Sequence, residues 1–133
     1  MTNKETVLAF VESINAHDVN RLAQLMSDDH VFVDAHGNEV VGKEKMSVGW
    51  RGYFEWFPDY QIEVTEIFEG MLGEEDGQTF AMFGFAGGSF KGSADAAWRL
   101  PAAWKAIAKD GRVALWQVFA DTKIPFEIIN SGG

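Results

Sequence analysis

The sequence contains no cysteine. Without thiols the chain can form neither a disulfide nor a thiolate metal site, and it suits a reducing compartment. It also lacks a long apolar run, because the longest one, over residues 80–88, is far short of the roughly 20 residues that a membrane-spanning helix needs. Residues 1–5 carry no basic stretch followed by an apolar one, so we expect no signal peptide and a cytoplasmic location.

Basic residues are scarce as well. The chain has 11 Lys and Arg against 20 Asp and Glu, which gives a formal net charge of -9. Such a charge repels nucleic acid and anionic membrane surfaces, so we expect neither as a partner. The acids between Glu63 and Asp76 indicate a solvated strand face and turn, because they lack the spacing of a calcium loop with its turn glycine.

Motifs for metals and cofactors are missing too. The three histidines are scattered and form no pair four residues apart on a helix, so we expect no metal site. The sequence has no phosphate-binding loop, no dinucleotide fingerprint and no nucleophile elbow. We therefore expect no cofactor.

Aromatic residues are plentiful, at 14% of the chain, with eleven Phe and five Trp. These wide, flat side chains fill cores and also line apolar pockets. The chain has 133 residues and shows no repeat and no linker, so we expect a single domain over residues 1–133. A domain of this size buries about two thirds of the surface that its unfolded chain exposes, so it can fold without a disulfide or a bound metal.

Three helices are predicted in the first half of the chain. Thr2-x-x-Glu5 is a capping box that opens a helix, which ends at residues 16–18. Asp18 can cap a second, short helix that ends at residues 27–29. The third helix is expected over residues 42–57, where apolar side chains recur at helical spacing until Pro58.

The other segments have the patterns of strands. Residues 30–36 alternate, and we expect His30, Phe32, Asp34 and His36 to share one face, the one that looks inward. Residues 79–86 are almost wholly apolar, which is typical of a strand buried on both faces. Further strands are expected at 39–41, from 60 with a bulge near 67–68, over 95–108 and over 113–120.

Turn residues separate these strands. A bulge or bend is expected at Gly87-Gly88, a bulge or an unpaired position at Pro101 and a hairpin turn at residues 109–112. Asp121 can cap a short final helix around residues 125–130. Helices that precede a run of strands indicate an α+β fold, with the helices on one face of a curved, mostly antiparallel sheet.

Several segments resemble a known superfamily. They are Ala9-Phe10-Val11-Glu12, Ala16-His17-Asp18-Val19, residues 27–34 (SDDHVFVD), Gly42-Lys43-Glu44, and residues 110–113 with 116–121. Together with the order of the elements, they are similar to the nuclear transport factor 2-like superfamily, most of all its SnoaL-like polyketide cyclase and ketosteroid isomerase branch. The resemblance implies a cone-shaped α+β barrel, an apolar pocket and a homodimer. It leaves function open, because the superfamily holds isomerases, cyclases, epoxide hydrolases and non-catalytic members.

Residue matching carries over only part of each catalytic set. Asp34 falls where ketosteroid isomerases have their general base, whereas Phe10 and Ala103 stand where those enzymes have the Tyr and Asp that hold the oxyanion. Asp121 looks like the last Asp of limonene-epoxide-hydrolase-like members. The middle strand, with Phe83 and Phe85, supplies neither the Arg nor the Asp of that set.

Four residues are candidates for acid/base chemistry. Asp34 in an apolar pocket would have a raised pKa, as suits a general base, or else it is hydrogen-bonded to the turn that follows. His36 would orient Asp34 or transfer a proton, or is an exposed turn residue. Asp121 would be a second pocket acid, or simply a helix cap. Tyr53 would donate to a developing oxyanion in place of the missing Tyr.

A further set of aromatic residues would line the pocket or belong to plain core: Phe10, Phe32, Trp50, Trp98 and Trp116. His17 and His30 are interpreted as surface or loop residues. The first hypothesis is a cofactor-independent isomerase or cyclase acting on an apolar, carbonyl-containing molecule of polyketide, terpenoid or steroid-like type. The second is a ligand-binding or dimeric assembly module of the same fold without catalysis.

Overall fold

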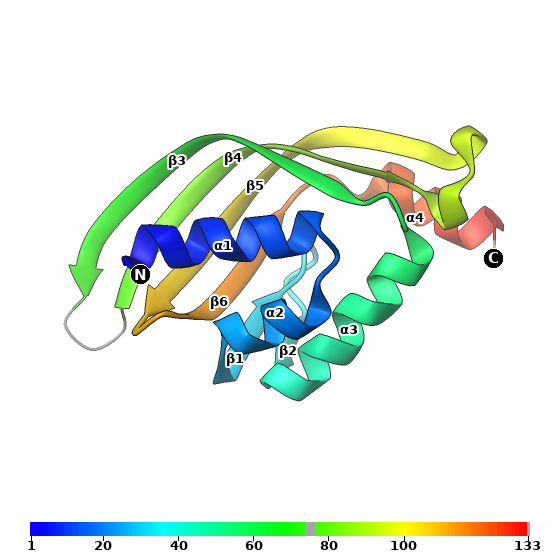
Figure 1. Ribbon diagram of the computed structural model, residues 1–133. Coiled ribbons are helices and arrows are strands. Elements are labelled where there is room, and N and C mark those ends of the chain that lie inside the picture. The colour runs from blue at the N-terminus through cyan, green and yellow to red at the C-terminus, as the bar shows by residue number, and fades with distance from the viewer. Residues whose placement is uncertain (74–76, 133) are drawn as a thin grey trace.

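Six strands form one curved sheet in the order β2-β1-β6-β5-β4-β3 (Figure 1). The computed structural model describes residues 1–73 and 77–132, so the acidic turn predicted at residues 74–76 lies outside the described residues. The strands are β1 (Met26–Val33), β2 (Glu39–Val41), β3 (Gln61–Gly73), β4 (Gly77–Ser89), β5 (Ala97–Lys109) and β6 (Arg112–Phe119). β1 and β6 run parallel, and every other neighbouring pair is antiparallel.

The helices are α1 (Asn3–Asn15), α2 (Val19–Leu25), α3 (Lys43–Trp56) and α4 (Lys123–Gly132), with two single 3-10 turns, η1 (Phe90–Gly92) and η2 (Ala94–Ala96). Figure 1 shows the long strands β3 to β5 curving over α1. The predicted α+β fold, with three N-terminal helices on a curved and mostly antiparallel sheet, is therefore confirmed. β2 and β3 are the two edges of the sheet, which is consequently open rather than a closed barrel.

The capping box begins α1 as predicted. The Thr2 hydroxyl accepts from the Glu5 backbone amide at 3.1 Å, and the Glu5 carboxylate accepts from the Thr2 amide at 3.0 Å. The buried face of the helix includes Val7, Phe10 and Ile14. Local capping and apolar spacing thus decide where α1 starts and which side packs inward.

The first strand differs from its prediction at both ends. β1 starts at Met26, which is already extended, because α2 ends at Leu25. It stops at Val33, and the next residues form a turn in which the Asp34 amide donates to the Asn38 carbonyl at 2.9 Å. Asp34 and His36 therefore lie in a turn, and the prediction that they continue the strand is wrong.

β4 is not buried on both faces. Phe80 and Met82 are fully buried on the inner face. Phe83, which points to the outer face, is 47% exposed. The prediction failed because an apolar run alone does not show whether a second layer covers the outer face.

Pairing between β4 and β5 continues in register through Gly87, Gly88 and Pro101, so the two strands have no bulge at these positions. Pro101 lies beyond the last residue pair between β5 and β6, so the unpaired position predicted for this proline is confirmed. Gly88 permits a close approach instead, because a Cβ there would lie 3.3 Å from Phe57 Cβ. The bulge predicted in β3 is confirmed by a register shift between Val64 and Glu66.

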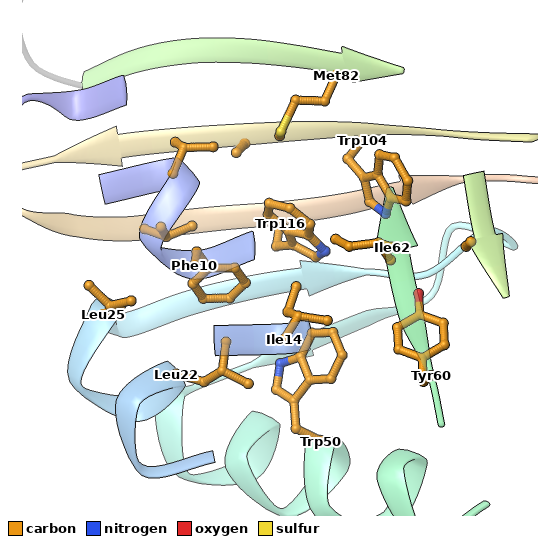
Figure 2. Close-up of a cluster of buried hydrophobic side chains, with 14 of the residues drawn as sticks. Phe10, Ile14, Leu22, Leu25, Trp50, Tyr60, Ile62, Met82, Trp104 and Trp116 are labelled. Atoms are coloured by element: carbon orange, nitrogen blue, oxygen red, sulfur yellow. The ribbon is translucent and has the colours of Figure 1, made fainter. Parts of the chain in front are cut away.

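The core fills the space between the inner face of the sheet and the first three helices (Figure 2). Trp104 and Trp116 project from β5 and β6, and Phe10 of α1 packs on Trp116 with ring centroids 4.9 Å apart. Trp50 reaches into the same cluster from α3 and is 4% exposed. The aromatic residues thus pack mainly on one another.

Candidate functional site

Asp34 holds the turn that follows β1. Its Oδ1 accepts from the backbone amides of His36 at 2.8 Å and Asn38 at 2.9 Å, and its Oδ2 accepts from the Asn38 side chain at 3.1 Å. Partial burial acts to raise the pKa of Asp34, but the hydrogen bonds from Asn38 and His36 outweigh it and hold the pKa below its usual value. The raised pKa expected for this residue is wrong, and its role as a base stays a prediction.

A pocket opens beside this turn, between the end of β6 and α4. Its volume is about 410 Å³. We call it the α4 pocket; its lining includes Ala35, His36, Ala120, Asp121, Thr122 and Phe126. The turn after β1 and the segment after β6 meet here because these two strands are parallel neighbours, so that their C-terminal ends lie next to each other.

His36 and Asp121, two predicted acid/base residues, thus come together in one pocket. His36 Nε2 lies 2.8 Å from the Thr122 hydroxyl oxygen, and the edge of its ring packs on Phe126 with centroids 4.9 Å apart. Asp121 Oδ1 accepts from the Lys123 amide at 3.0 Å, at the start of α4. Its second carboxylate oxygen has no hydrogen bond among the described residues that would compete with a ligand.

Tyr53 lies away from this pocket. On α3 its ring packs edge-on against Tyr60 at 4.8 Å and against Phe57 at 5.1 Å. Burial, with a smaller effect of Tyr60, raises the pKa of Tyr53 well above its usual value. The phenol therefore stays protonated and able to donate, but it is not among the residues that line the α4 pocket.

The five aromatic residues expected to line a pocket lie in or against the core. Phe10, Trp50, Trp98 and Trp116 are buried, and Phe32 is half-buried. Phe32 packs edge-on against Trp50 at 6.0 Å. Their contacts are those of packed core side chains, and their role in ligand binding stays a prediction.

The interpretation of His30 as a surface or loop residue is wrong. Its side chain is fully buried, and its Nδ1 lies 2.7 Å from the Val113 carbonyl oxygen on β6. His17 does lie in a loop, after α1, where its ring stacks on Phe54 at 4.1 Å. The alternation of residues 30–36 contained a signal for His30, since this residue shares the inward face of β1 with Phe32.

Across residues 1–73 and 77–132, no three His, Cys, Asp or Glu side chains gather in a set that could hold a metal ion. None of the helices in the described part of the chain is both long and apolar enough to cross a membrane.

A curved, mostly antiparallel sheet with helices packed inside it is the nuclear transport factor 2-like, or cystatin-like, class of α+β fold. Residues 7–118 match the family model for the SnoaL-like domain, and the chain belongs to this family. A comparison with curated proteins finds no match.

Solved structures share the fold at low sequence identity. A ketosteroid isomerase-like protein of Catenulispora acidiphila, in complex with trimethylamine, has a TM-score of 0.72 and 20% identity over 89% of this chain and 86% of its own. A proposed SnoaL-like polyketide cyclase of Shewanella denitrificans has 0.77 and 14%, over 97% of each chain. An LEH-like epoxide hydrolase of M. tuberculosis has 0.73 and 14%, over 96% and 84%.

Proposed function

We propose that this protein binds a small, largely apolar molecule in the α4 pocket and moves a proton on it with His36 and Asp121. The observation that supports this is the meeting of both residues in one pocket of about 410 Å³ that also contains Ala35, Ala120 and Phe126. A few polar groups on an apolar lining are typical of small-molecule sites. Structural relatives described as a polyketide cyclase, an epoxide hydrolase and a trimethylamine complex support a small ligand.

The chemistry follows from the side chains present. A neutral His36 ring can accept a proton from the carbon next to a ligand carbonyl, which leaves an enolate. Returning that proton to another carbon of the same molecule isomerises or cyclises it without an oxidant or a cofactor. Asp121 can stabilise the imidazolium that forms between the two steps, since opposite charges in a partly enclosed site attract. Asp34 positions His36, because its carboxylate accepts a hydrogen bond from the His36 backbone amide.

Proton exchange at carbon tests this proposal. Cyclohexanone in D₂O is a simple probe, and NMR reports how fast its hydrogens next to the carbonyl exchange. The wild-type protein should accelerate exchange, and His36→Gln should remove about 100-fold or more of that acceleration. Exchange that survives His36→Gln but is lost in Asp34→Asn would make Asp34 the base instead. Acceleration that survives both changes would contradict acid/base chemistry at this site.

A second candidate is a non-catalytic module that works as a homodimer. The observation that favours it is an apolar row on the outer face of the sheet, where Phe68, Phe83 and Phe119 are 53%, 47% and 49% exposed. Phe83 pairs with Ala103, which pairs with Phe119, so the row crosses three strands. Phe68 packs on Phe83 at 5.9 Å and extends the row to β3.

Two copies could bury this row against each other. Sedimentation would then show a dimer for the wild type and a monomer for Phe83→Glu, because a carboxylate in the centre of the contact loses its hydration. Trp56→Glu is the matched control, since Trp56 is also 47% exposed but lies on α3. A monomeric wild type, or a dimer that persists in Phe83→Glu, would rule out this interface.

A further inference from the structure

β3 forms one edge of the sheet, and most of the strand is exposed (Figure 1). In the described sheet it pairs only with β4, so the other side of its backbone has no neighbouring strand. Between residues 61 and 70, only Ile62 is buried, Val64 and Ile67 are half-buried, and the other residues are exposed. The opposite edge, β2, has only three residues. A long exposed edge is a template on which another extended chain can pair.

Asn15 shows that the open side of β3 can form the hydrogen bonds of a strand. Its side-chain Nδ2 donates to the Ile62 carbonyl at 2.9 Å, and its Oδ1 accepts from the Ile62 amide at 2.8 Å. One side chain thus makes both bonds that a residue of a neighbouring strand would make. The backbone groups of Ile62 therefore point away from β4, toward the open edge.

The pairing with β4 identifies the other residues that point the same way. In an antiparallel pair, every second residue directs its N–H and C=O away from the partner strand. The partners of Ile62, Val64, Ile67 and Glu69 on β4 are each two residues apart, which continues this set across the register shift. Within the described residues, no backbone hydrogen bond outside the β3–β4 pair reaches Val64, Ile67 or Glu69.

The side chains of β3 indicate what kind of chain fits beside it. On the outer face, Glu63 and Glu66 are exposed. Glu63 pairs with Arg99 at 3.1 Å, whereas Glu66 has no ion pair among the described residues. On the inner face, Val64 and Ile67 pack against the core. A neighbouring strand would place alternate side chains next to acids and next to apolar groups.

We propose that the open edge of β3 is a docking site for an extended segment of another protein in which basic and apolar residues alternate. The segment adds a seventh strand and bonds to the free backbone groups of Val64, Ile67 and Glu69. Its basic side chains meet Glu63 and Glu66, and the net charge of -9 adds to this attraction. A second copy of this chain fits poorly, because two β3 edges would bring like charges together.

Two synthetic peptides of opposite charge test the proposal. The basic one is acetyl-Lys-Val-Lys-Val-Lys-Val-Lys-amide, and the acidic control has Glu in place of every Lys. Titration followed by NMR should show at least about tenfold tighter binding of the basic peptide, and weaker binding as salt is added. Equal affinity for the two peptides, or no saturable binding of the basic one up to roughly 1 mM, would overturn the proposal.

Hydrogen exchange shows where the peptide binds. In the free protein the amides of Val64, Ile67 and Glu69 should exchange faster than the Phe68 amide, which points toward β4. At a free peptide concentration of about ten times Kd, exchange at the three outward amides should slow about tenfold. Saturable binding that leaves these three amides unprotected would contradict an added strand. Protection that appears without peptide and rises with protein concentration would make the partner a second copy, contrary to the proposal.

Two matched pairs of variants separate the backbone from the charge. Glu69→Pro and Glu69→Ala both remove the acid, but only proline removes the outward N–H, and an edge strand tolerates it there. Glu69→Pro should bind the basic peptide at least about fivefold more weakly than Glu69→Ala. Glu66→Lys should weaken binding about tenfold, whereas Glu39→Lys, an equal charge change on β2, should change it less than about twofold. Equal affinities within either pair would contradict docking at β3.

Discussion

At the scale of single residues, His30 couples folding to pH. Its pKa is lowered in the folded protein, whereas in the unfolded chain it returns to about 6.5. Below pH 6.5 the His30 side chain is protonated in the unfolded chain but binds a proton less readily in the folded protein, so stability falls as the pH drops. Between pH 7.5 and 5.0 this loss in the free energy of unfolding can reach at most about 2 kcal/mol, since the unfolded value of about 6.5 lies about 1.5 pH units above the lower limit.

Urea denaturation at the two pH values measures this loss. His30→Phe should reduce the pH dependence by that amount, whatever it does to stability at pH 7.5, because Phe does not titrate. An unchanged pH dependence in the variant would show that His30 is protonated in the folded protein.

Asp34 should contribute to stability through its turn. Asp34→Ala leaves the backbone amides of His36 and Asn38 without their acceptor and should cost about 1–2 kcal/mol at pH 7. Because the folded pKa of Asp34 is lowered, this contribution is complete above the unfolded value of about 3.9 and is lost as the pH falls further. Chemical denaturation at pH 7 and pH 3 tests it, with the exposed Asp95→Ala as control. A variant as stable as wild type at pH 7 would contradict these bonds.

The residues of the site were predictable in kind but not in arrangement. A sequence that places Asp34 just before Gly37-Asn38 allows both a pocket base and a turn acceptor, and the choice depends on where β1 ends. The burial of His30 depends on Val113, which lies 83 positions away and pairs through the parallel contact of β1 and β6. Such long-range pairings leave little local trace in a sequence.

At the scale of elements, the capping box should be important for α1. Thr2→Ala removes the hydroxyl that accepts from Glu5 and should lower stability by about 1 kcal/mol. Thermal unfolding followed by circular dichroism measures the change, and Lys4→Ala in the same first turn is the control. Equal melting temperatures for Thr2→Ala and wild type would mean that the core alone holds this helix.

Local signals explain which elements were predicted correctly. The hairpin turn at Asp110-Gly111 needs two residues with positive φ, and both have it, at 53° and 76°. β2 was predicted with its observed ends, residues 39–41. The start of β1 and the exposed face of β4 were missed, because they depend on which other elements pack against them.

At the scale of the whole molecule, the order of elements and the apolar faces were enough to predict a curved, mostly antiparallel sheet packed on three helices. They were not enough to predict how the inside is filled. The aromatic side chains expected to line a pocket form a packed core, as Phe10 does against Trp116. The α4 pocket instead forms where β1 and β6 end, from residues more than 80 positions apart.

The α4 pocket is therefore the central claim about this protein, and locating a bound ligand tests it most directly. Cyclohexanone is titrated into ¹⁵N-labelled protein, and the shifts of all backbone amide signals are followed. We predict that the largest shifts cluster at residues 35–36 and 120–127, and that His36→Gln weakens binding. Shifts confined to the outer face of the sheet around Phe83, or no saturable shifts at all, would contradict a ligand site at the α4 pocket.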